Sequence, residues 1–254
     1  MKLEKQVAEL YKDAELYDIQ SMSQQDLHFW GSLVKSYSIS SFLEICCGTG
    51  RIGVIVINFL DLYHGVDLSA SFLEKFRKKV HQPHAKFELY QARMQDFDTG
   101  RNYDAVAIPF NSFSHLYTFE DIDKTLKNVA KHMKEEAIFV FDIHNPSLEI
   151  LLREPHKEIP IGKFTYPSLG IKVILYESNR YDRASQINNI SWRYVTEEGE
   201  EIKRLFLPMR IFFPAEMDNI LITHGFKTVH KYGTFYRKLF NSESPKQIYI
   251  CRKG

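Results

Sequence analysis

The sequence predicts an α/β fold: a doubly wound, seven-stranded, mostly parallel sheet with an antiparallel last strand, plus an inserted antiparallel β meander. Three observations predict it. Short apolar segments alternate with helical ones over residues 41–142, as in parallel strands joined by helical crossovers. Residues 165–213 then alternate in polarity with no helical segment between them. The last two apolar segments are joined by a stretch too short for a crossover helix, so they should pair as a hairpin.

Each element follows from its local pattern. Residues 3–37 read as helical with a break near 18–23, and Leu27, Trp30 and Leu33 recur at helical spacing. Further helices are expected over 51–60, 69–79, 119–133 and 214–224, where Ser69 can cap the second and Pro214 can open the last. Strands are expected over 41–46, 62–67, 86–91, 104–108, 137–142, 226–232 and 247–252, and the meander over 171–181, 186–195 and 202–213.

This order of elements suggests two domains. Residues 1–150 and 214–254 should form one ligand-binding domain, in which residues 1–40 make a helical lid. Residues 151–213 should form the inserted β subdomain. In a parallel sheet of this kind, ligands bind beyond the carboxyl ends of the strands, so the functional residues should follow those ends.

Composition narrows the class of function. The 254 residues carry 33 Lys and Arg against 32 Asp and Glu, so no strong field attracts nucleic acid or an anionic membrane. The three cysteines fit neither a disulfide framework nor a metal site, and no metal is expected. The first residues are charged and no apolar run is long enough to span a bilayer. We expect a cytoplasmic protein with a small-molecule partner.

A glycine turn between a strand and a helix is the strongest local signal. Residues 42–53 place Glu44 on the strand and Gly48, Gly50 and Gly53 in the turn, where the backbone can approach a nucleotide-like cofactor. These glycines, with Asp67 after the next strand, also satisfy the dinucleotide fingerprint of a nicotinamide-dependent oxidoreductase. Glu44 opposes that alternative, since its charge would repel a pyrophosphate and attract an ammonium group.

The chain resembles the class I, Rossmann-like S-adenosylmethionine-dependent methyltransferases. Residues 42–51 look like their first motif, residues 65–69 like their second, and residues 103–106 like their fourth strand. Residues 14–18, Ala-Glu-Leu-Tyr-Asp, are similar to a segment that small-molecule members place over the cofactor. Within the class, the inserted meander is most like the branch with sugar N,N-dimethyltransferases and glycine or sarcosine methyltransferases.

The resemblance implies S-adenosyl-L-methionine as cofactor and assigns residues to it. Gly48 and Gly50 would admit its methionine part, Glu44 would lie near its ammonium, and Asp67 would accept hydrogen bonds from the ribose hydroxyls. The full implied set is Tyr17, Trp30, Glu44, Cys46, Gly48, Gly50, Arg51, Asp67, Leu68, Met94, Gln95, Pro109 and Asn111. Two positions depart from the family pattern. Cys46 replaces the first of the usual glycines, and Arg93 stands near the third strand where an acid is usual.

The implied reaction transfers the methyl group to a nitrogen or oxygen of a small polar molecule by in-line displacement. Alignment and exclusion of water can supply most of the catalysis, and a base is needed only for a hydroxyl or a protonated amine. His115 and His144, after the fourth and fifth strands, are the candidates for that role. A non-catalytic cofactor-binding protein remains an alternative. The acceptor and the oligomeric state do not follow from the sequence.

Overall fold

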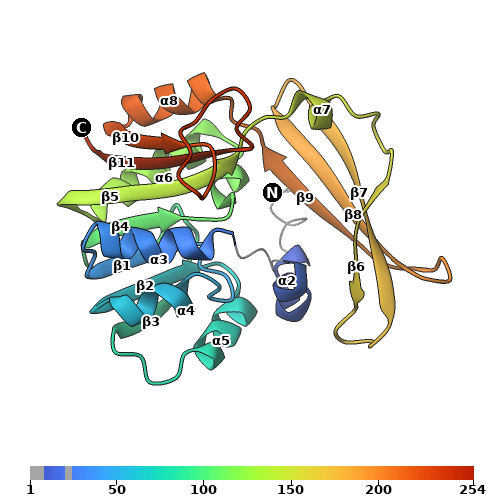
Figure 1. Cartoon of the computed structure of the whole chain (residues 1–254), viewed down its shortest axis with the longest axis horizontal. Coiled ribbons are helices and arrows are strands. Elements are labelled where there is room, and N and C mark those ends of the chain that lie inside the picture. Colours follow the sequence, from blue (N-terminus) through green and yellow to red (C-terminus); the bar gives the residue numbers. More distant parts are fainter. Residues whose placement is uncertain (1–8, 21–24) are drawn as a thin grey trace. The chain divides into compact units, whose positions relative to one another are not determined.

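The computed structural model describes residues 9–20 and 25–254, which divide into two compact units. One unit contains residues 9–20 with 146–211, and the other contains residues 25–145 with 212–254. The chain crosses between the units after Asn145 and again before Phe212. Figure 1 shows the seven-stranded sheet of the larger unit and the separate antiparallel sheet of the smaller one. Residues 1–8 and 21–24, which include part of the expected helical arm and half of its break, lie outside the described residues.

The larger unit contains the predicted sheet, and its topology is confirmed. The strand order is β10-β11-β5-β4-β1-β2-β3, in which β11 runs antiparallel to both of its neighbours. The other pairs are parallel. Strands β1, β2 and β3 proceed outward on one side, and β4 and β5 on the other, with β11 inserted between β5 and the edge strand β10. The order therefore reverses between β1 and β4. The strands are β1 Ser41–Ile45, β2 Leu62–Asp67, β3 Lys86–Gln91, β4 Tyr103–Ile108, β5 Met133–His144, β10 Phe226–Tyr232 and β11 Lys246–Lys253.

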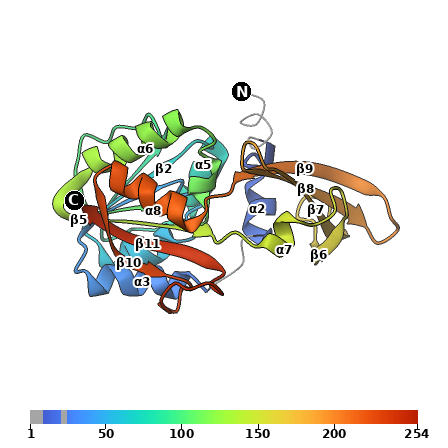
Figure 2. The same ribbon diagram turned by 90° about the horizontal axis from the view of Figure 1, so that it is seen from above.

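Helices cover both faces of this sheet, and each face has its own apolar core. On one face, α6 (Phe119–Lys131) and α8 (Pro214–Thr223) contribute Ile122, Leu126 and Met217 to a cluster with alternate strand residues. On the other face lie α3 (Leu27–Ser36), α4 (Gly53–Val56) and α5 (Ala70–Lys79). Figure 2 shows α6 and α8 on the side of the sheet opposite α3. All members of both clusters belong to the larger unit.

Local sequence explains where the helices begin. The Ser69 hydroxyl accepts a hydrogen bond from the backbone N–H of Phe72 at 3.3 Å, so Ser69 caps α5 as expected. Thr118 caps α6 in the same way, by accepting from the N–H of Asp121 at 3.1 Å. Pro214 occupies the first position of α8, where its missing N–H has no intrahelical partner to lose.

Several predicted boundaries are wrong. The helix expected over 51–60 is the short α4, followed by a 3₁₀ turn, η1 (Ile57–Phe59). Strand β5 begins at Met133 and not at 137, directly after His132 ends α6. A 3₁₀ turn, η2 (Ser112–His115), and a short helix, α7 (Leu148–Leu151), were not expected.

The smaller unit is built on a four-stranded antiparallel sheet of order β6-β7-β8-β9. Its strands are β6 Ile159–Thr165, β7 Lys172–Asp182, β8 Ile187–Thr196 and β9 Glu201–Arg210. Three of them match the expected meander, and β6 adds a strand that the alternation did not indicate. Helix α2 (Ala14–Gln20) belongs to this unit: Leu16 is buried in a cluster with Val173 and Tyr194. Asp13 pairs with Lys203 of β9 at 3.3 Å.

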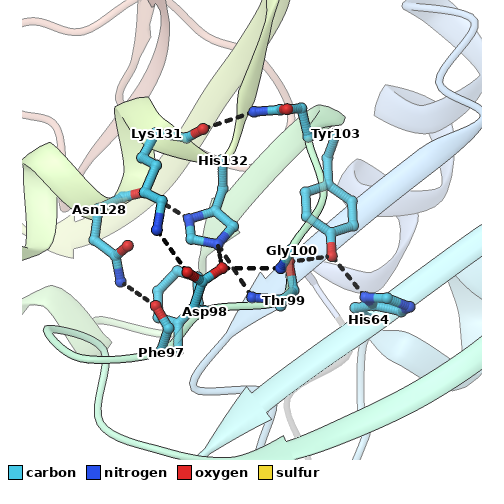
Figure 3. Close-up of polar contacts among 10 residues, drawn as sticks. His64, Phe97, Asp98, Thr99, Gly100, Tyr103, Asn128, Lys131 and His132 are labelled. Carbon is cyan, nitrogen blue, oxygen red and sulfur yellow. Dashed lines mark hydrogen bonds and ion pairs between the residues drawn. The ribbon is translucent and has the colours of Figure 1, made fainter.

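A polar network fastens the amino-terminal edge of the larger sheet, where β4 and β5 begin (Figure 3). The buried His132 ring lies 2.9 Å from the Asn128 carbonyl through Nδ1 and accepts from the backbone N–H of Thr99 through Nε2 at 3.2 Å. The Tyr103 hydroxyl donates to Thr99 at 2.7 Å and lies 2.6 Å from Nδ1 of His64. Burial lowers the pKa of His64. These contacts hold the loop before β4 against the end of α6.

Candidate functional site

The carboxyl ends of β1, β2, β4 and β5 lie along one edge of the larger sheet, next to the reversal of strand order. Each of these strands is followed by a residue or turn that the sequence predicted to be functional. In doubly wound sheets a ligand binds at such a reversal, because the crossover helices diverge there and leave the strand ends accessible. We therefore describe this edge, from the glycine turn after β1 to the beginning of β11, as the candidate ligand edge.

The turn after β1 has a backbone that explains its glycines. Gly48 and Gly50 have φ of 58° and 85°, in the left-handed region that favours glycine. A Cβ added at Gly50 would lie 2.0 Å from Cδ2 of Phe76 in α5, so a side chain there would displace the helix. Cys46 also has a positive φ, 60°. The position that departs from the family pattern therefore has the backbone of a glycine, although it carries a thiol whose pKa is raised by burial.

Asp67 ends β2 and is fixed by two backbone amides. Its Oδ2 accepts from the N–H of Gly48 at 2.8 Å, and its Oδ1 accepts from the N–H of Ser69 at 2.8 Å. One carboxylate thus joins the glycine turn to the end of the next strand. Burial raises the pKa of Asp67, against the effect of these hydrogen bonds. Each oxygen retains a lone pair for a ligand hydroxyl.

Glu44 is a buried acid in the middle of β1. Its side chain is 2% exposed, and its Oε2 accepts from the Tyr63 hydroxyl at 2.6 Å. No other hydrogen bond to this carboxyl comes from the described residues. Burial raises its pKa to about 8, while the Tyr63 hydroxyl and the Arg51 charge lower it in part. Glu44 is therefore mostly protonated at neutral pH in this structure, and a cation brought beside it would favour ionisation.

Arg51 is engaged by the protein itself. Its guanidinium forms a two-pronged ion pair with Asp26, with 2.7 Å between Nη1 and Oδ1, and it lies 4.5 Å from the ring centroid of Phe110. Asp26 is 3% exposed and directly precedes α3. The sequence suggested a carboxylate partner for Arg51 without identifying it. Arg51 clamps the start of α3 to the segment after β4.

The segment after β4 is supported by two charged residues, Asp142 and Lys246. Phe110 and Asn111 both have φ of 58°, an arrangement that is costly for phenylalanine. The Phe110 N–H donates to Oδ1 of Asp142 at 2.7 Å. The Asp142 side chain is fully buried. Lys246, the first residue of β11, donates to the other Asp142 oxygen at 2.7 Å and to Oδ1 of Asn111 at 2.9 Å. Sequence reasoning did not single out Lys246. The signal was the acid at the end of β5, because a buried aspartate needs a cation or several donors.

The remaining predicted residues of the larger unit have varied surroundings. Leu68 is 62% exposed directly after Asp67, and Pro109 is buried at the end of β4. Met94 is partly buried against the core, while the Gln95 amide donates to Asp121 at 3.1 Å. His115 ends η2, with its Nδ1 3.4 Å from the Tyr117 hydroxyl. His144 is the last residue of β5, and desolvation together with the charge of Lys246 lowers its pKa to about 4.

The two predicted aromatic residues lie in different units. Trp30 is fully buried in α3 with its ring edge-on to Phe29 and Phe42, and its indole N–H has no partner among the described residues. Tyr17 belongs to the smaller unit, where its ring meets that of Tyr11 at 6.0 Å. Trp30 is thus a core residue beneath β1.

The ligand edge fits the chemistry of an S-adenosylmethionine molecule. Glu44 offers a buried carboxyl with an unpaired oxygen, which suits an ammonium group, and Asp67 offers a fixed carboxylate for paired hydroxyls. Gly48 and Gly50 add no side chains of their own to this turn, and both have a positive φ. Among residues 9–20 and 25–254, no group of three or more His, Cys, Asp or Glu side chains could hold a metal ion.

Comparison with known proteins bears on the larger unit. Residues 42–136 match a protein family described as "Methyltransferase domain". This span runs from β1 into β5 and includes Glu44, the glycine turn, Asp67 and Asn111. Residues 42–136 are thus similar to a methyltransferase domain. The resemblance found in the sequence is confirmed for this domain, in preference to the nicotinamide alternative.

Curated relatives match between about two fifths and nearly all of this chain. A dTDP-3-amino-3,6-dideoxy-alpha-D-glucopyranose N,N-dimethyltransferase from Streptomyces fradiae is 30% identical over 136 residues, 51% of this chain and 52% of that protein. A glycine/sarcosine N-methyltransferase from Aphanothece halophytica is 23% identical over 246 residues, 94% of this chain and 86% of that protein. The chain spans 42% of the length of two similar methyltransferases, from Geobacillus sp. (strain WCH70) and Bacillus subtilis (strain 168).

Solved structures share the fold across both units. The CcbJ methyltransferase from Streptomyces caelestis has a TM-score of 0.79 at 20% identity, with 96% of each chain covered. At this identity the likeness concerns the fold, which is that of the class I S-adenosylmethionine-dependent methyltransferases. No helix in the described part of the chain is long and apolar enough to cross a membrane.

Proposed function

We propose that the protein transfers a methyl group from S-adenosylmethionine to a nitrogen or oxygen of a small polar molecule. The observation that carries the proposal is the pairing of Glu44 and Asp67 on either side of one glycine turn. The two carboxyl groups match an ammonium at one end of the cofactor and ribose hydroxyls at the other. The methyltransferase domain and the fold support the same conclusion.

A sugar amine or an amino acid is the proposed class of acceptor. Two relatives are named for an amino-dideoxy sugar and for glycine or sarcosine, which share an amine beside oxygen-bearing groups. The bound cofactor supplies an activated methyl group. The residues of this chain would then hold the cofactor, exclude water and orient the acceptor atom. We place the reaction in the cytoplasm. The balanced charge of the chain suggests that nucleic acid is not a partner.

The remaining predicted cofactor contacts belong to this proposal. Leu68, Met94, Gln95 and Pro109 follow the strand ends on either side of the glycine turn and would line the adenine side of the site. Residues 1–40, with Tyr17, would cover it. His115 and His144 are the proposed bases for an acceptor that must lose a proton, since both follow strands that end at the ligand edge.

Titration calorimetry with S-adenosylhomocysteine and with NAD tests the proposal. The wild-type protein should bind S-adenosylhomocysteine and not NAD. Asp67→Ala should weaken that binding by about 100-fold, since the loss of a charged hydrogen-bond acceptor costs about 1.5–3 kcal/mol. Asp61→Ala is the matched control, because Asp61 precedes the other end of the same strand and is exposed. Binding of NAD alone would overturn the proposal.

Transfer of a labelled methyl group then tests the acceptor class. A panel containing glycine, sarcosine and a dTDP-3-amino sugar should include a product that carries label. Cofactor binding without label transfer to any amine or hydroxyl in the panel would favour the non-catalytic alternative.

A further inference from the structure

Lys246 has two polar neighbours, and it determines the orientation of the side-chain amide of one of them, Asn111. Its ammonium group donates to Asp142 and to Oδ1 of Asn111, at 2.7 and 2.9 Å. A lysine ammonium can only donate hydrogen bonds, so the atom of the Asn111 amide that faces it must be the oxygen. The Nδ2 group of Asn111 is therefore turned away from Lys246, and it makes no hydrogen bond with the described residues.

The backbone around Asn111 is held by the same group of residues. Asp142 accepts the N–H of Phe110, the first residue of the left-handed pair, and Lys246 balances the charge of Asp142. Lys246 thus contacts the side chain of Asn111 directly and supports its backbone through Asp142. The three residues come from β11, β5 and the segment after β4, so the arrangement depends on the antiparallel last strand.

We propose that Lys246 is a positioning residue that makes Asn111 present a hydrogen-bond donor at the ligand edge. This proposal rests on the proposed function. A hydrogen-bond donor at this place can bind an oxygen lone pair. The molecule that receives the methyl group should therefore carry a hydroxyl, carbonyl or carboxylate oxygen beside the atom that is methylated. An ammonium group of the acceptor would find no partner in Nδ2. The resemblance placed Asn111 at the site without a hydrogen-bonding role, and Lys246 gives it that of a donor.

A matched control exists on the neighbouring strand. Lys231 is 17% exposed, against 18% for Lys246, and each lysine donates to an aspartate at 2.7 Å. Both ammonium groups also lie over aromatic rings, at 4.5 Å from Phe240 for Lys231 and 5.3 Å from Phe235 for Lys246. Lys231→Met therefore removes the same charge and the same kind of contact away from Asn111.

The side-chain amide signals of Asn111 in ¹⁵N NMR spectra test the proposal. The signals are assigned by their loss in Asn111→Ala. In wild type loaded with S-adenosylhomocysteine, acetate should shift them and methylammonium should not. Lys246→Met should move the signals even before acetate is added and should abolish the acetate shift. Lys231→Met should behave as wild type does.

Two outcomes would overturn the proposal: unmoved Asn111 signals in Lys246→Met, or a response to methylammonium in place of acetate. If Lys246→Met does not fold because Asp142 is left buried and charged, Lys246→Met with Asp142→Asn removes both charges and keeps an acceptor for the Phe110 N–H. The signals are compared with and without S-adenosylhomocysteine. Failure of wild type to bind that ligand would overturn the proposed function, while the comparison without ligand would still decide the role of Lys246.

Discussion

Glu44 shows how one residue can be both costly to the fold and useful to a ligand. Its carboxyl group is buried in a central strand with one hydroxyl partner, and this burial raises its pKa to about 8. The carboxyl is therefore mostly neutral at pH 7. A nearby cation reverses this preference, because the charged pair is stronger where water is excluded. A buried acid with a strongly shifted pKa is common at functional sites.

The pKa of Glu44 gives a prediction about stability. Below about pH 4.5 the carboxyl is protonated in the folded and the unfolded chain, so it carries no penalty. As the pH rises to about 8, the unfolded chain loses this proton while the folded chain keeps it, and the free energy of unfolding should fall by about 1.4 kcal/mol per pH unit. Glu44→Gln, which cannot ionise, should lack this slope.

Urea unfolding of both proteins at pH 5, 6, 7 and 8 measures the difference. The stability advantage of Glu44→Gln over wild type should grow across this range and level off above about pH 8. Two curves that stay parallel from pH 5 to pH 8 would contradict the raised pKa. The same variant should bind S-adenosylhomocysteine more weakly, because an amide attracts an ammonium less than a carboxylate does.

Single residues differ in how far the sequence reveals them. Glu44, Asp67 and the turn glycines form a local pattern, so their positions could be predicted. Cys46 departed from that pattern, and its φ of 60° shows that the backbone there did not change with the residue. Lys246 could not be found in this way, since its partners lie 104 and 135 positions away in the chain and no periodicity links them.

At the scale of elements, burial on one or two faces decided what could be predicted. Strands β1, β4 and β5 are buried runs, and helices α5 and α6 each bury one apolar face, so all of these were expected. Strand β6 was missed because it is an edge strand with a proline, a glycine and mostly exposed side chains, which leaves no alternation to detect. Helix α4 is shorter than its apolar sequence suggested.

The loop before β4 provides a test at the scale of elements. Replacing the buried His132 with leucine leaves the Thr99 N–H without its acceptor, so His132→Leu should destabilise the protein by about 2–3 kcal/mol. His224 is the matched control: it also ends a helix and contacts the carbonyl four residues earlier, at 2.7 Å, but it is partly exposed. His224→Leu should cost less than about 1 kcal/mol.

Chemical unfolding measures both variants, and calorimetry with S-adenosylhomocysteine measures the ligand edge. Because the His132 network lies at the amino ends of β4 and β5, ligand affinity should be unchanged in the folded state of either variant (Figure 3). Equal losses of stability in the two variants, or a loss of affinity in His132→Leu, would contradict this separation.

For the whole molecule, the larger unit contains everything needed to hold its own fold. Its two apolar clusters draw no residue from the smaller unit. The chain leaves it after Asn145, which bonds to the Ser244 and Pro245 carbonyls, and returns at Phe212, whose carbonyl accepts from Gln247. Both crossing points are therefore bonded to residues 244–247 at the start of β11. A short linker should suffice to join Asn145 to Phe212.

A shortened chain tests this independence. Residues 23–145 joined to 212–254 by a Gly-Ser linker should unfold cooperatively and bind S-adenosylhomocysteine within about tenfold of the full chain. Methyl transfer should be lost, since residues 1–22 of the proposed lid and the antiparallel sheet are absent. Asp67→Ala in the shortened chain is the control and should weaken binding by about 100-fold, as in the full chain. A shortened chain without a cooperative transition would show that the larger unit depends on residues 146–211.

The direction of β11 has a practical consequence. Because this strand runs against β5, its beginning lies at the ligand edge, with the loop of residues 233–245 before it, and its end lies at the opposite edge. Gly254 is fixed there by a bond from its N–H to the Gly225 carbonyl at 2.7 Å. The loop can therefore vary in length and sequence, and so in the molecules it admits, while both of its ends stay anchored in a hairpin. For protein engineering, an affinity tag or a fused partner attached after Gly254 would lie at the edge of the sheet opposite the candidate ligand edge.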